Sequence, residues 1–440
     1  MAGDALNSGE ASDPEARYRW YVLAILMLAY TVHYLDRSVV NAVLEPIRVE
    51  FHVSDAALGL LAGPVYAVAF ACAGVPLGLL IDRVNRKRLL ATLLAGWSAL
   101  TFVSGFAGGF SMLLAARAAV GAAEAGGSPT AMSLLSDYFP ASKRATATGV
   151  FFLSVTLGIF LGYLVSGVVA AHHGWRAAFL VAGAPGLLIA LLLMATVREP
   201  PRGRFDARAV QARPSLLETF SALLGRRALA LTLVALVIAA TVTGGFNAFV
   251  ISLLVRRYEL GLAEAAIIVS VSLGVFGGLG SVFWGALSDR VAERGAFAPP
   301  LLIAITSLIA TGFGVFGVLE GSLKSSILGI AGFSLFITSF MGGGYGLLLN
   351  LSPPSIRGAC TAMAQVLVNL IGVGFGPLVV GGLSSALGAS GKVDGLAWAL
   401  VLVLLLSLVS AACQVGVANA LRRSAAAGQS PLPNPLPAPN

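Results

Sequence analysis

The sequence is short of charge. Only 11% of its 440 residues are Asp, Glu, Lys or Arg, whereas a soluble domain carries about 25%. Hydrophobic residues make up 57% of the chain and occur in long runs. This composition excludes an ordinary soluble domain and predicts an all-α membrane protein. The 52 glycines agree with this, because small residues let membrane helices approach closely.

Cysteine is also scarce. The three cysteines lie in apolar runs without C-x-x-C spacing, which favours buried side chains over a disulfide framework or a metal site: Cys72, Cys360 and Cys413. The chain has no phosphate loop and no nucleophile elbow. We therefore expect no cofactor, no metal and no enzyme active site.

Apolar runs of membrane-spanning length are abundant. A spanning helix needs about 20 apolar residues. Residues 1–17 have no apolar signal-peptide core, so we expect the first helix to direct its own insertion. Twelve spans are predicted, at residues 19–43, 57–81, 88–106, 110–137, 145–171, 175–197, 228–254, 264–287, 299–319, 323–351, 356–387 and 395–420.

Positive charge sets the orientation. If both termini are cytoplasmic, 20 of the 28 lysines and arginines lie on the inner side and six on the outer side, with Arg37 and Arg117 inside spans. Such enrichment marks the cytoplasmic side of a membrane protein. We predict a multi-pass protein of a bacterial inner membrane. The net charge of +8 then reflects topology and makes a nucleic-acid partner unnecessary.

The longest polar connection divides the spans into six and six, which predicts two bundles. The expected domains are a disordered cytoplasmic tail (1–18), an N-terminal six-helix bundle (19–197), a cytoplasmic linker (198–227), a C-terminal six-helix bundle (228–420) and a Pro-rich cytoplasmic tail (421–440).

The two halves repeat short motifs. Residues 78–83 (GLLIDR) correspond to 285–290 (GALSDR), and residues 140–144 (PASKR) correspond to 353–357 (PPSIR). The offsets are 207 and 213 residues, close to half the chain. Pseudo-symmetric bundles with a site between them are typical of alternating-access transporters.

Residues 78–88 (GLLIDRVNRKR) resemble the signature loop of the major facilitator superfamily, although Asn85 stands where that pattern usually has Gly. The runs 117–121 (RAAVG), 158–162 (GIFLG) and 174–176 (GWR) are also similar to this family. The resemblance covers essentially the whole membrane portion and implies the major facilitator fold.

The resemblance also implies a cytoplasmic latch. Asp82 would lie at the N-terminus of the eleventh helix, where the helix dipole favours an anion. A basic loop that only sets topology is the alternative, but topology requires no Asp among the arginines. The expected gating residues are Asp82, Arg83, Arg86, Asp137 and Arg144, with Asp289, Arg290 and Arg357 as a weaker counterpart.

Within that superfamily, the runs 33–37 (HYLDR), 82–87 (DRVNRK), 120–125 (VGAAEA) and 198–203 (REPPRG) resemble the spinster family of lipid transporters. That family is associated with sphingosine phosphate, related sphingolipids and lysophospholipids. His33 stands where spinster proteins usually have Asn. The Tyr-x-Asp-Arg part of the first run is also similar to organic-anion and hexuronate symporters.

Four charged residues lie inside apolar spans: Asp36, Arg37, Arg117 and Glu124. A charge at membrane depth costs at least about 2.5 kcal/mol, so retaining four indicates a function. At about 1.5 Å per residue, Arg37 and Glu124 differ in depth by about one helical turn and can pair. Arg117 is two turns from Glu124 on the same face of its helix.

A carboxylate that loses its arginine when two bundles rock acts as a proton switch. We expect Asp36 and Glu124 to take up and release protons while Arg37 exchanges partners. Arg37 or Arg117 would hold an anionic headgroup, because guanidinium matches phosphate geometry. A static ion-pair network that orients the two helices is the alternative.

The second bundle has polar amides and no intramembrane charge. Its Gly-, Phe-, Val- and Leu-rich helices suit an acyl chain better than a sugar, although helix packing explains them equally well. Asp55, at the outer end of the second span, is an alternative partner for Arg37 in an outward-closed state. The candidate substrate-binding residues are Arg37, Arg117, Glu124, Tyr34, Asn247, Asn350 and Asn369.

The sequence therefore predicts a monomeric, proton-coupled transporter of an amphipathic lipid anion that works by alternating access. A symporter of a small organic anion, such as a hexuronate or an aromatic carboxylate, is the alternative within the same class. A membrane enzyme and a lipid sensor that does not transport are alternatives from other classes.

Overall fold

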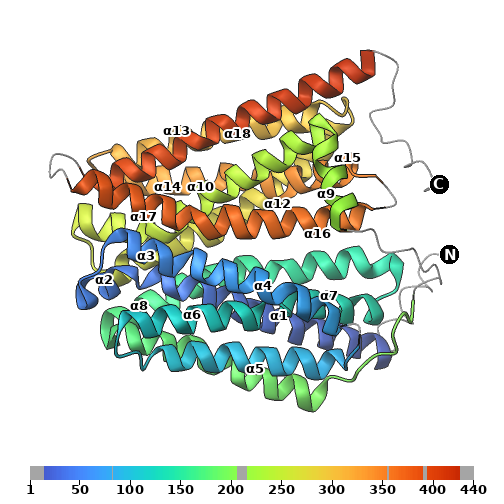
Figure 1. Ribbon diagram of the computed structural model, residues 1–440, viewed down its shortest axis with the longest axis horizontal. Helices are drawn as coiled ribbons and strands as arrows, with labels where there is room; N and C mark the ends of the chain where they lie inside the picture. Colours follow the sequence, from blue (N-terminus) through green and yellow to red (C-terminus); the bar gives the residue numbers. More distant parts are fainter. Residues whose placement is uncertain (1–13, 82, 206–215, 354–355, 390–393, 427–440) are drawn as a thin grey trace, which may run out of the picture. The chain divides into compact units, whose positions relative to one another are not determined.

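The computed structural model describes residues 14–81, 83–205, 216–353, 356–389 and 394–426. The regular elements in these ranges are all helices (Figure 1). Asp82, most of both predicted tails and the middle of the predicted linker lie outside the described residues. The prediction of an all-α membrane protein is confirmed.

The chain forms two compact units. The first contains Met1–Val43 and Val68–Val210, and the second contains Leu44–Ala67 and Gln211–Asn440. The segment Leu44–Ala67 runs from the end of the first predicted span into the second, and it groups with the second half of the chain. The predicted domain bounds stay a prediction.

The first unit is built from long helices that follow the predicted spans. They are α1 (Pro14–Ala42), α4 (Pro64–Ile81, shared with the second unit), α5 (Arg86–Ser104), α6 (Phe110–Glu124), α7 (Gly127–Tyr138) and α8 (Ala141–Thr196). The 56 residues of α8 cover two spans, which meet at a kink at Gly174. The backbone there has φ of +82°, a conformation that favours glycine because it has no Cβ.

The second unit contains α2 (Leu44–Phe51), α3 (Asp55–Ala62), α9 (Leu216–Gly225), α10 (Arg227–Tyr258), α11 (Leu262–Val269), α12 (Gly277–Ala292), α13 (Ala298–Leu319), α14 (Leu323–Ile337), α15 (Tyr345–Leu351), α16 (Arg357–Leu367), α17 (Gly374–Gly388) and α18 (Gly395–Ala426). Three π-helical segments connect helices within single spans: Ser270–Phe276, Phe340–Gly344 and Val368–Val373. Such widened turns are rare in helices and often occur at functional sites.

Helices occupy all twelve predicted spans. Among the described residues, nine helices are by themselves long and apolar enough to cross a membrane, and one of these, Ser142–Thr196, covers two spans. The other two spans are α5, which begins with Arg86, Lys87 and Arg88, and the consecutive short helices α6 and α7. The described residues thus contain the predicted twelve membrane spans of the two six-helix bundles.

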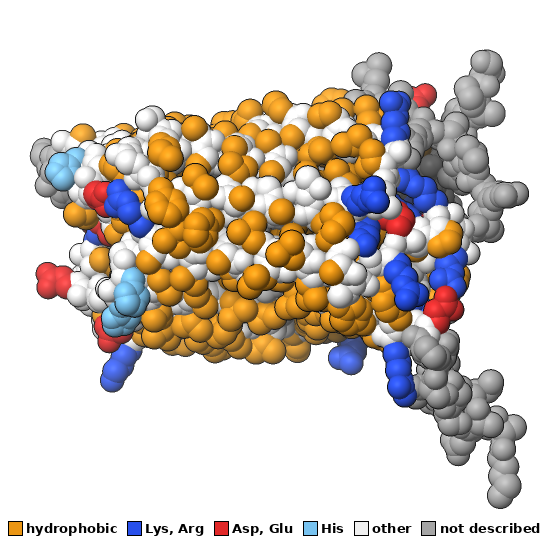
Figure 2. All heavy atoms as spheres, turned by 90° about the horizontal axis from the view of Figure 1, so that it is seen from below, with side chains coloured by type: hydrophobic (Ala, Val, Ile, Leu, Met, Phe, Trp, Pro, Cys, Tyr) orange, Lys and Arg blue, Asp and Glu red, His pale blue; other side chains and the backbone are white. Residues whose placement is uncertain are grey.

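Bulky apolar side chains cover much of the lipid-facing exterior. Figure 2 shows a broad hydrophobic band on one face, with Lys and Arg gathered mainly at one end of it. Leu188, Val75 and Val282 are each about two-thirds exposed. Exposing such side chains to water is unfavourable, whereas exposing them to lipid hydrocarbon is not. This surface is that of a protein surrounded by lipid.

Glycine allows close backbone contact at two helix pairs. In the first unit, a Cβ at Gly158 or Gly162 of α8 would lie 2.5 Å from atoms of Thr31 or Ser38 on α1. In the second unit, α3 packs along α17, and a Cβ at Gly381 would overlap the backbone carbonyl of Asp55. These approaches explain part of the high glycine content.

We expect Gly381→Ala to destabilise the protein, because its methyl group has no space against Asp55 and overpacking costs about 1–3 kcal/mol. Thermal unfolding of the purified protein in detergent measures this as a lower Tm. The adjacent Gly382→Ala is the matched control, since a Cβ at Gly382 meets no atom within 4 Å. Equal Tm values for the two variants would contradict close packing between α3 and α17.

Candidate functional site

A buried cluster of ionisable side chains lies inside the first unit, between α1 and α6. Asp36 and Glu124 have no exposed surface, and Arg117 and His33 are each 4% exposed. On α1, the spacing of three and four residues places His33, Asp36 and Arg37 within one turn of each other. The heptad spacing of Arg117 and Glu124 places both on one face of α6.

The cluster is arranged around two carboxylates. Glu124 Oε2 lies 3.3 Å from His33 Nδ1. A guanidinium nitrogen of Arg117 donates to the backbone carbonyl of Asp36 at 3.5 Å, and the Asp36 carboxylate faces Arg117, Glu124 and Thr101. Two acids and their cations therefore share one water-poor volume, where electrostatic interactions are strong.

Arg37 extends this cluster towards the unit's surface. Its side chain is only half-buried, and its guanidinium carbon lies 5.7 Å from the centroid of the Tyr34 ring, which is also half-buried. The predicted pairing of Arg37 with Glu124 stays a prediction. His33 also contacts Glu124, at 3.3 Å.

His33 is the member of the cluster that sequence reasoning missed, because its departure from the spinster pattern gave it little weight. The helical spacing was the available signal: His33 stands three residues before Asp36 and four before Arg37. Its ring stacks on Tyr30 with a centroid distance of 5.2 Å and contacts Trp97 edge-on at 6.0 Å.

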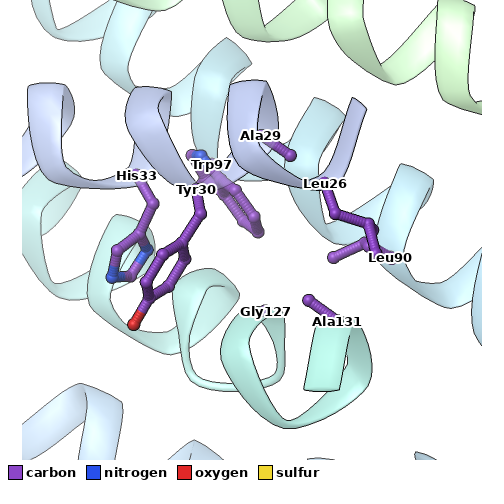
Figure 3. Close-up of a pocket in the computed structure, with 8 residues that line it drawn as sticks. All are labelled: Leu26, Ala29, Tyr30, His33, Leu90, Trp97, Gly127 and Ala131. Carbon is purple, nitrogen blue, oxygen red and sulfur yellow. The ribbon is translucent and has the colours of Figure 1, made fainter. Parts of the chain in front are cut away.

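A small cavity adjoins the cluster. Figure 3 shows His33 and Tyr30 from α1 beside Trp97 from α5, with Gly127 and Ala131 of α7 on the opposite wall. The cavity volume of about 10 Å³ is close to the minimum for one water molecule. The remaining lining residues, Leu26, Ala29 and Leu90, are apolar.

The predicted amides of the second unit are spread over three helices. Asn247 is half-buried on α10, and Asn350 is exposed near the end of α15. Asn369 lies within the π-helical segment Val368–Val373, and its amide nitrogen donates to the carbonyl of Gln365 at 2.9 Å. Their role in substrate binding stays a prediction.

A second charged group, the outer cluster, lies in the second unit. It consists of Glu45, Arg48, Asp55 and Arg256, and is named for the side on which the predicted topology places it. Arg256 donates to both carboxylate oxygens of Asp55, at 2.8 and 2.7 Å, and to Glu45 at 2.8 Å. Ser384 of α17 donates to Asp55 at 2.6 Å. The recorded partner of Asp55 is Arg256, and its alternative pairing with Arg37 in an outward-closed state stays a prediction.

The inner cluster lies in the first unit and consists of Arg86, Asp137 and Glu199. Arg86 is 2% exposed and donates to Asp137 at 2.5 Å and to Glu199 at 2.8 Å. The other Glu199 oxygen accepts from the backbone N–H of Lys87 at 2.8 Å, at the N-terminus of α5 where the helix dipole favours an anion. Glu199 was not among the predicted gating residues.

The inner cluster also ties down the chain that follows α8. The backbone N–H of Gly203 donates to Asp137 at 3.0 Å, and the Arg202 guanidinium donates to the carbonyls of Ile81 and Val84 at 2.7 and 2.6 Å. The start of the linker is therefore held against the ends of α4, α5 and α7.

The other predicted gating residues are placed differently. Arg83 is exposed, and Arg144 donates to the Ser136 carbonyl at 2.8 Å. Asp289 and Arg290 are exposed near the end of α12, while Arg357 is half-buried at the first turn of α16. Asp82 lies outside the described residues, so its predicted position at the eleventh helix stays a prediction.

The fold and the buried ion cluster define a membrane transporter. A family model described as Major Facilitator Superfamily matches residues 26–377, and the chain therefore belongs to that superfamily of transporters of small molecules.

Within the superfamily the chain resembles the spinster proteins. It is 27% identical to a bacterial homolog of the human lysosomal transporter Spinster, solved in an inward-facing and unoccupied conformation, with a TM-score of 0.84 over 94% of this chain and 98% of that one. It is 29% identical to the sphingosine-1-phosphate transporter SPNS2 of Mus musculus, over 84% of this chain and 70% of the relative. It is also 25% identical to an MFS-type efflux pump of Mycolicibacterium smegmatis, over 93% of this chain and 95% of the pump.

We expect Arg86→Ala to lower the free energy of unfolding by about 3–5 kcal/mol, because it leaves the buried Asp137 without its cation. Thermal unfolding in detergent measures the effect. Arg88→Ala is the matched control, since the Arg88 side chain is exposed two residues further along α5. If both variants kept the Tm of the unmodified protein, the inner cluster would not stabilise the fold.

Proposed function

We propose that this protein is a proton-coupled secondary transporter that moves an amphipathic lipid anion by alternating access. The observation that carries the proposal is the buried cluster of Asp36, Arg117, Glu124 and His33. Burying several ionisable groups in one helix pair is expensive, and a packed apolar contact would join α1 and α6 at lower cost. The groups therefore serve transport.

Coupling follows from competition for the carboxylates. Glu124 or Asp36 keeps its charge while a cation is near and takes up a proton when that cation is engaged elsewhere. An anionic substrate that binds Arg37 or Arg117 changes this balance. Proton binding and substrate binding are thereby linked through the same guanidinium groups.

A lipid phosphate is the preferred substrate class. Guanidinium groups form paired hydrogen bonds with phosphate, and the half-buried Arg37 and Tyr34 lie at the edge of the cluster where a headgroup would arrive. The apolar helices of the second bundle suit the chain of a sphingosine phosphate or a lysophospholipid. The likeness to a sphingosine-1-phosphate transporter supports this class.

A small organic anion is the second candidate, because the same arginines also match a carboxylate and the run Tyr34-Leu35-Asp36-Arg37 resembles hexuronate symporters. Thermal unfolding separates the two, since a ligand that binds only the folded protein raises the Tm. We expect sphingosine-1-phosphate or a lysophospholipid to raise the Tm and a hexuronate to leave it unchanged. The opposite result would favour the small anion.

The outer cluster supports alternating access. The segment Leu44–Ala67 continues α1 and leads into α4, yet its Asp55 and Glu45 bind Arg256 of α10. Opening the protein to the outside requires these ion pairs to break. The inner cluster, with Asp82, Arg83 and Arg144 nearby in sequence, would hold the opposite side closed in the alternate state. We place the protein in a bacterial inner membrane as a monomer with both termini cytoplasmic.

We expect Arg256→Ala to increase the time that the outer side is open, because Asp55 and Glu45 lose their shared cation. The measurement is labelling of Ser384→Cys by a membrane-impermeant thiol reagent added outside, with Cys72, Cys360 and Cys413 replaced by alanine. Ser384 is 4% exposed, so labelling should be slow until the cluster opens. Arg257→Ala is the control, and labelling rates that are equal in both variants would exclude a gating role.

We expect Glu124→Gln to abolish substrate uptake driven by an imposed pH gradient in proteoliposomes, because the amide takes up no proton. Exchange of substrate at equal pH should persist, since it needs no net proton movement. The exposed Glu264→Gln serves as control. Full gradient-driven uptake by Glu124→Gln would refute the assignment of the proton site.

A further inference from the structure

The contact between His33 and Glu124 carries an inference that rests on the proposed function and extends it. The 3.3 Å separation joins Nδ1 of the ring to a carboxylate oxygen, and the two side chains are 5% and 0% exposed. Nδ1 is buried and no hydrogen bond to it is recorded, so the Glu124 oxygen is its recorded ionisable contact. In an apolar interior a histidine nitrogen and a carboxylate oxygen, both acceptors, approach each other only when a proton lies between them.

We propose that His33 is the proton relay of the coupling site. With hydrogen on Nδ1, the neutral ring donates to ionised Glu124, and the pair has a charge of minus one. A hydronium ion then gives a proton to Nε2 and leaves as water, the Nδ1–H bond breaks, and the proton from Nδ1 bonds to Glu124 Oε2. The ring ends neutral with hydrogen on Nε2, Glu124 ends as a carboxylic acid, and the pair has gained one proton and no net positive charge.

The neighbouring groups favour a relay over a resting imidazolium. The neighbours of the His33 ring on α1 are Tyr30, Tyr34 and Arg37. Its neighbours on α6 are Arg117 and Glu124. Both guanidinium groups repel a second cation at this position, so a proton that reaches the ring is driven towards the carboxylate. Asp36, the second acid of the cluster, faces Arg117 and Glu124.

The elements that pack against α1 hold the ring in this orientation. Tyr30 stacks on it with an angle of 9° between the planes, and Trp97 of α5 contacts it edge-on. On α8, Phe151 stacks on Tyr30. The Tyr163 hydroxyl, also on α8, accepts a hydrogen bond from Asn41 near the end of α1. His33 also lines the small cavity between α1, α5 and α7 (Figure 3), which has room for one water molecule beside the aromatic rings.

Transport by proteoliposomes provides the first test, with sphingosine-1-phosphate and a lysophospholipid as probes. We expect His33→Asn to reduce pH-gradient-driven uptake about tenfold while exchange at equal pH changes by less than about twofold, because only the proton step is impaired. His33→Asn combined with Glu124→Gln should lose no more than Glu124→Gln alone, since the two residues act in one step. His173→Asn, at an exposed histidine, is the control.

Uptake by His33→Asn equal to that of the unmodified protein would overturn the relay. So would an additional loss in the double variant. Failure of the unmodified protein to respond to a pH gradient would instead overturn the proposed function, and the two failures are therefore distinguishable.

Fluorescence tests the pairing without any substrate. Indole emission responds to a change of charge nearby. Trp97 contacts the His33 ring, and the pair of His33 and Glu124 loses its negative charge when it takes up a proton. In a protein whose other tryptophans (Trp20, Trp175, Trp284 and Trp398) are replaced by phenylalanine, we expect a pH-dependent change in emission that Glu124→Gln abolishes and His33→Asn shifts to another midpoint. A midpoint that His33→Asn leaves unchanged would refute proton sharing between His33 and Glu124, whether or not the protein transports either probe.

Discussion

The burial of ionisable side chains between α1 and α6 is the constraint on which the rest of the structure depends. Asp36 and Glu124 have no contact with solvent, so each must be paired with a cation or hold a proton. The side chains around them must therefore supply a positive charge or a proton. Arg117, from the same helix as Glu124, and His33, from the same helix as Asp36, are such side chains. It also makes the electrostatic state of the first unit sensitive to a single proton or a single anionic ligand.

Two other ion clusters lie apart from this buried cluster, one in each unit. At the inner end of the first unit, Arg86 is saturated by Asp137 and Glu199, and the chain after α8 is held by Gly203 and Arg202. In the second unit, Arg256 is saturated by Asp55 and Glu45. In each cluster two carboxylates bond to one shared arginine, and these bonds stabilise particular arrangements of helix ends.

Glycine supports the outer cluster mechanically. Because Gly381 lacks a side chain, α17 approaches α3 closely enough for Ser384 to bond with Asp55. The same closeness leaves no space for intermediate packing, and a tightly packed contact of this kind tends to be either formed or broken.

The sequence by itself determined the number of membrane spans, the family and the principal charged residues. The length of an apolar run and the charges within it are local properties of the chain. The repeat of Asp82-Arg83 as Asp289-Arg290 also indicated two related halves. Only the tertiary structure decided the partners. That Asp55 binds Arg256 and that Glu199 completes the Arg86 cluster depends on segments that are distant in the sequence. The spacing on α1 already places His33 beside Asp36 and Arg37, but its contact with Glu124 appeared only in the tertiary structure, because Glu124 lies on a different helix.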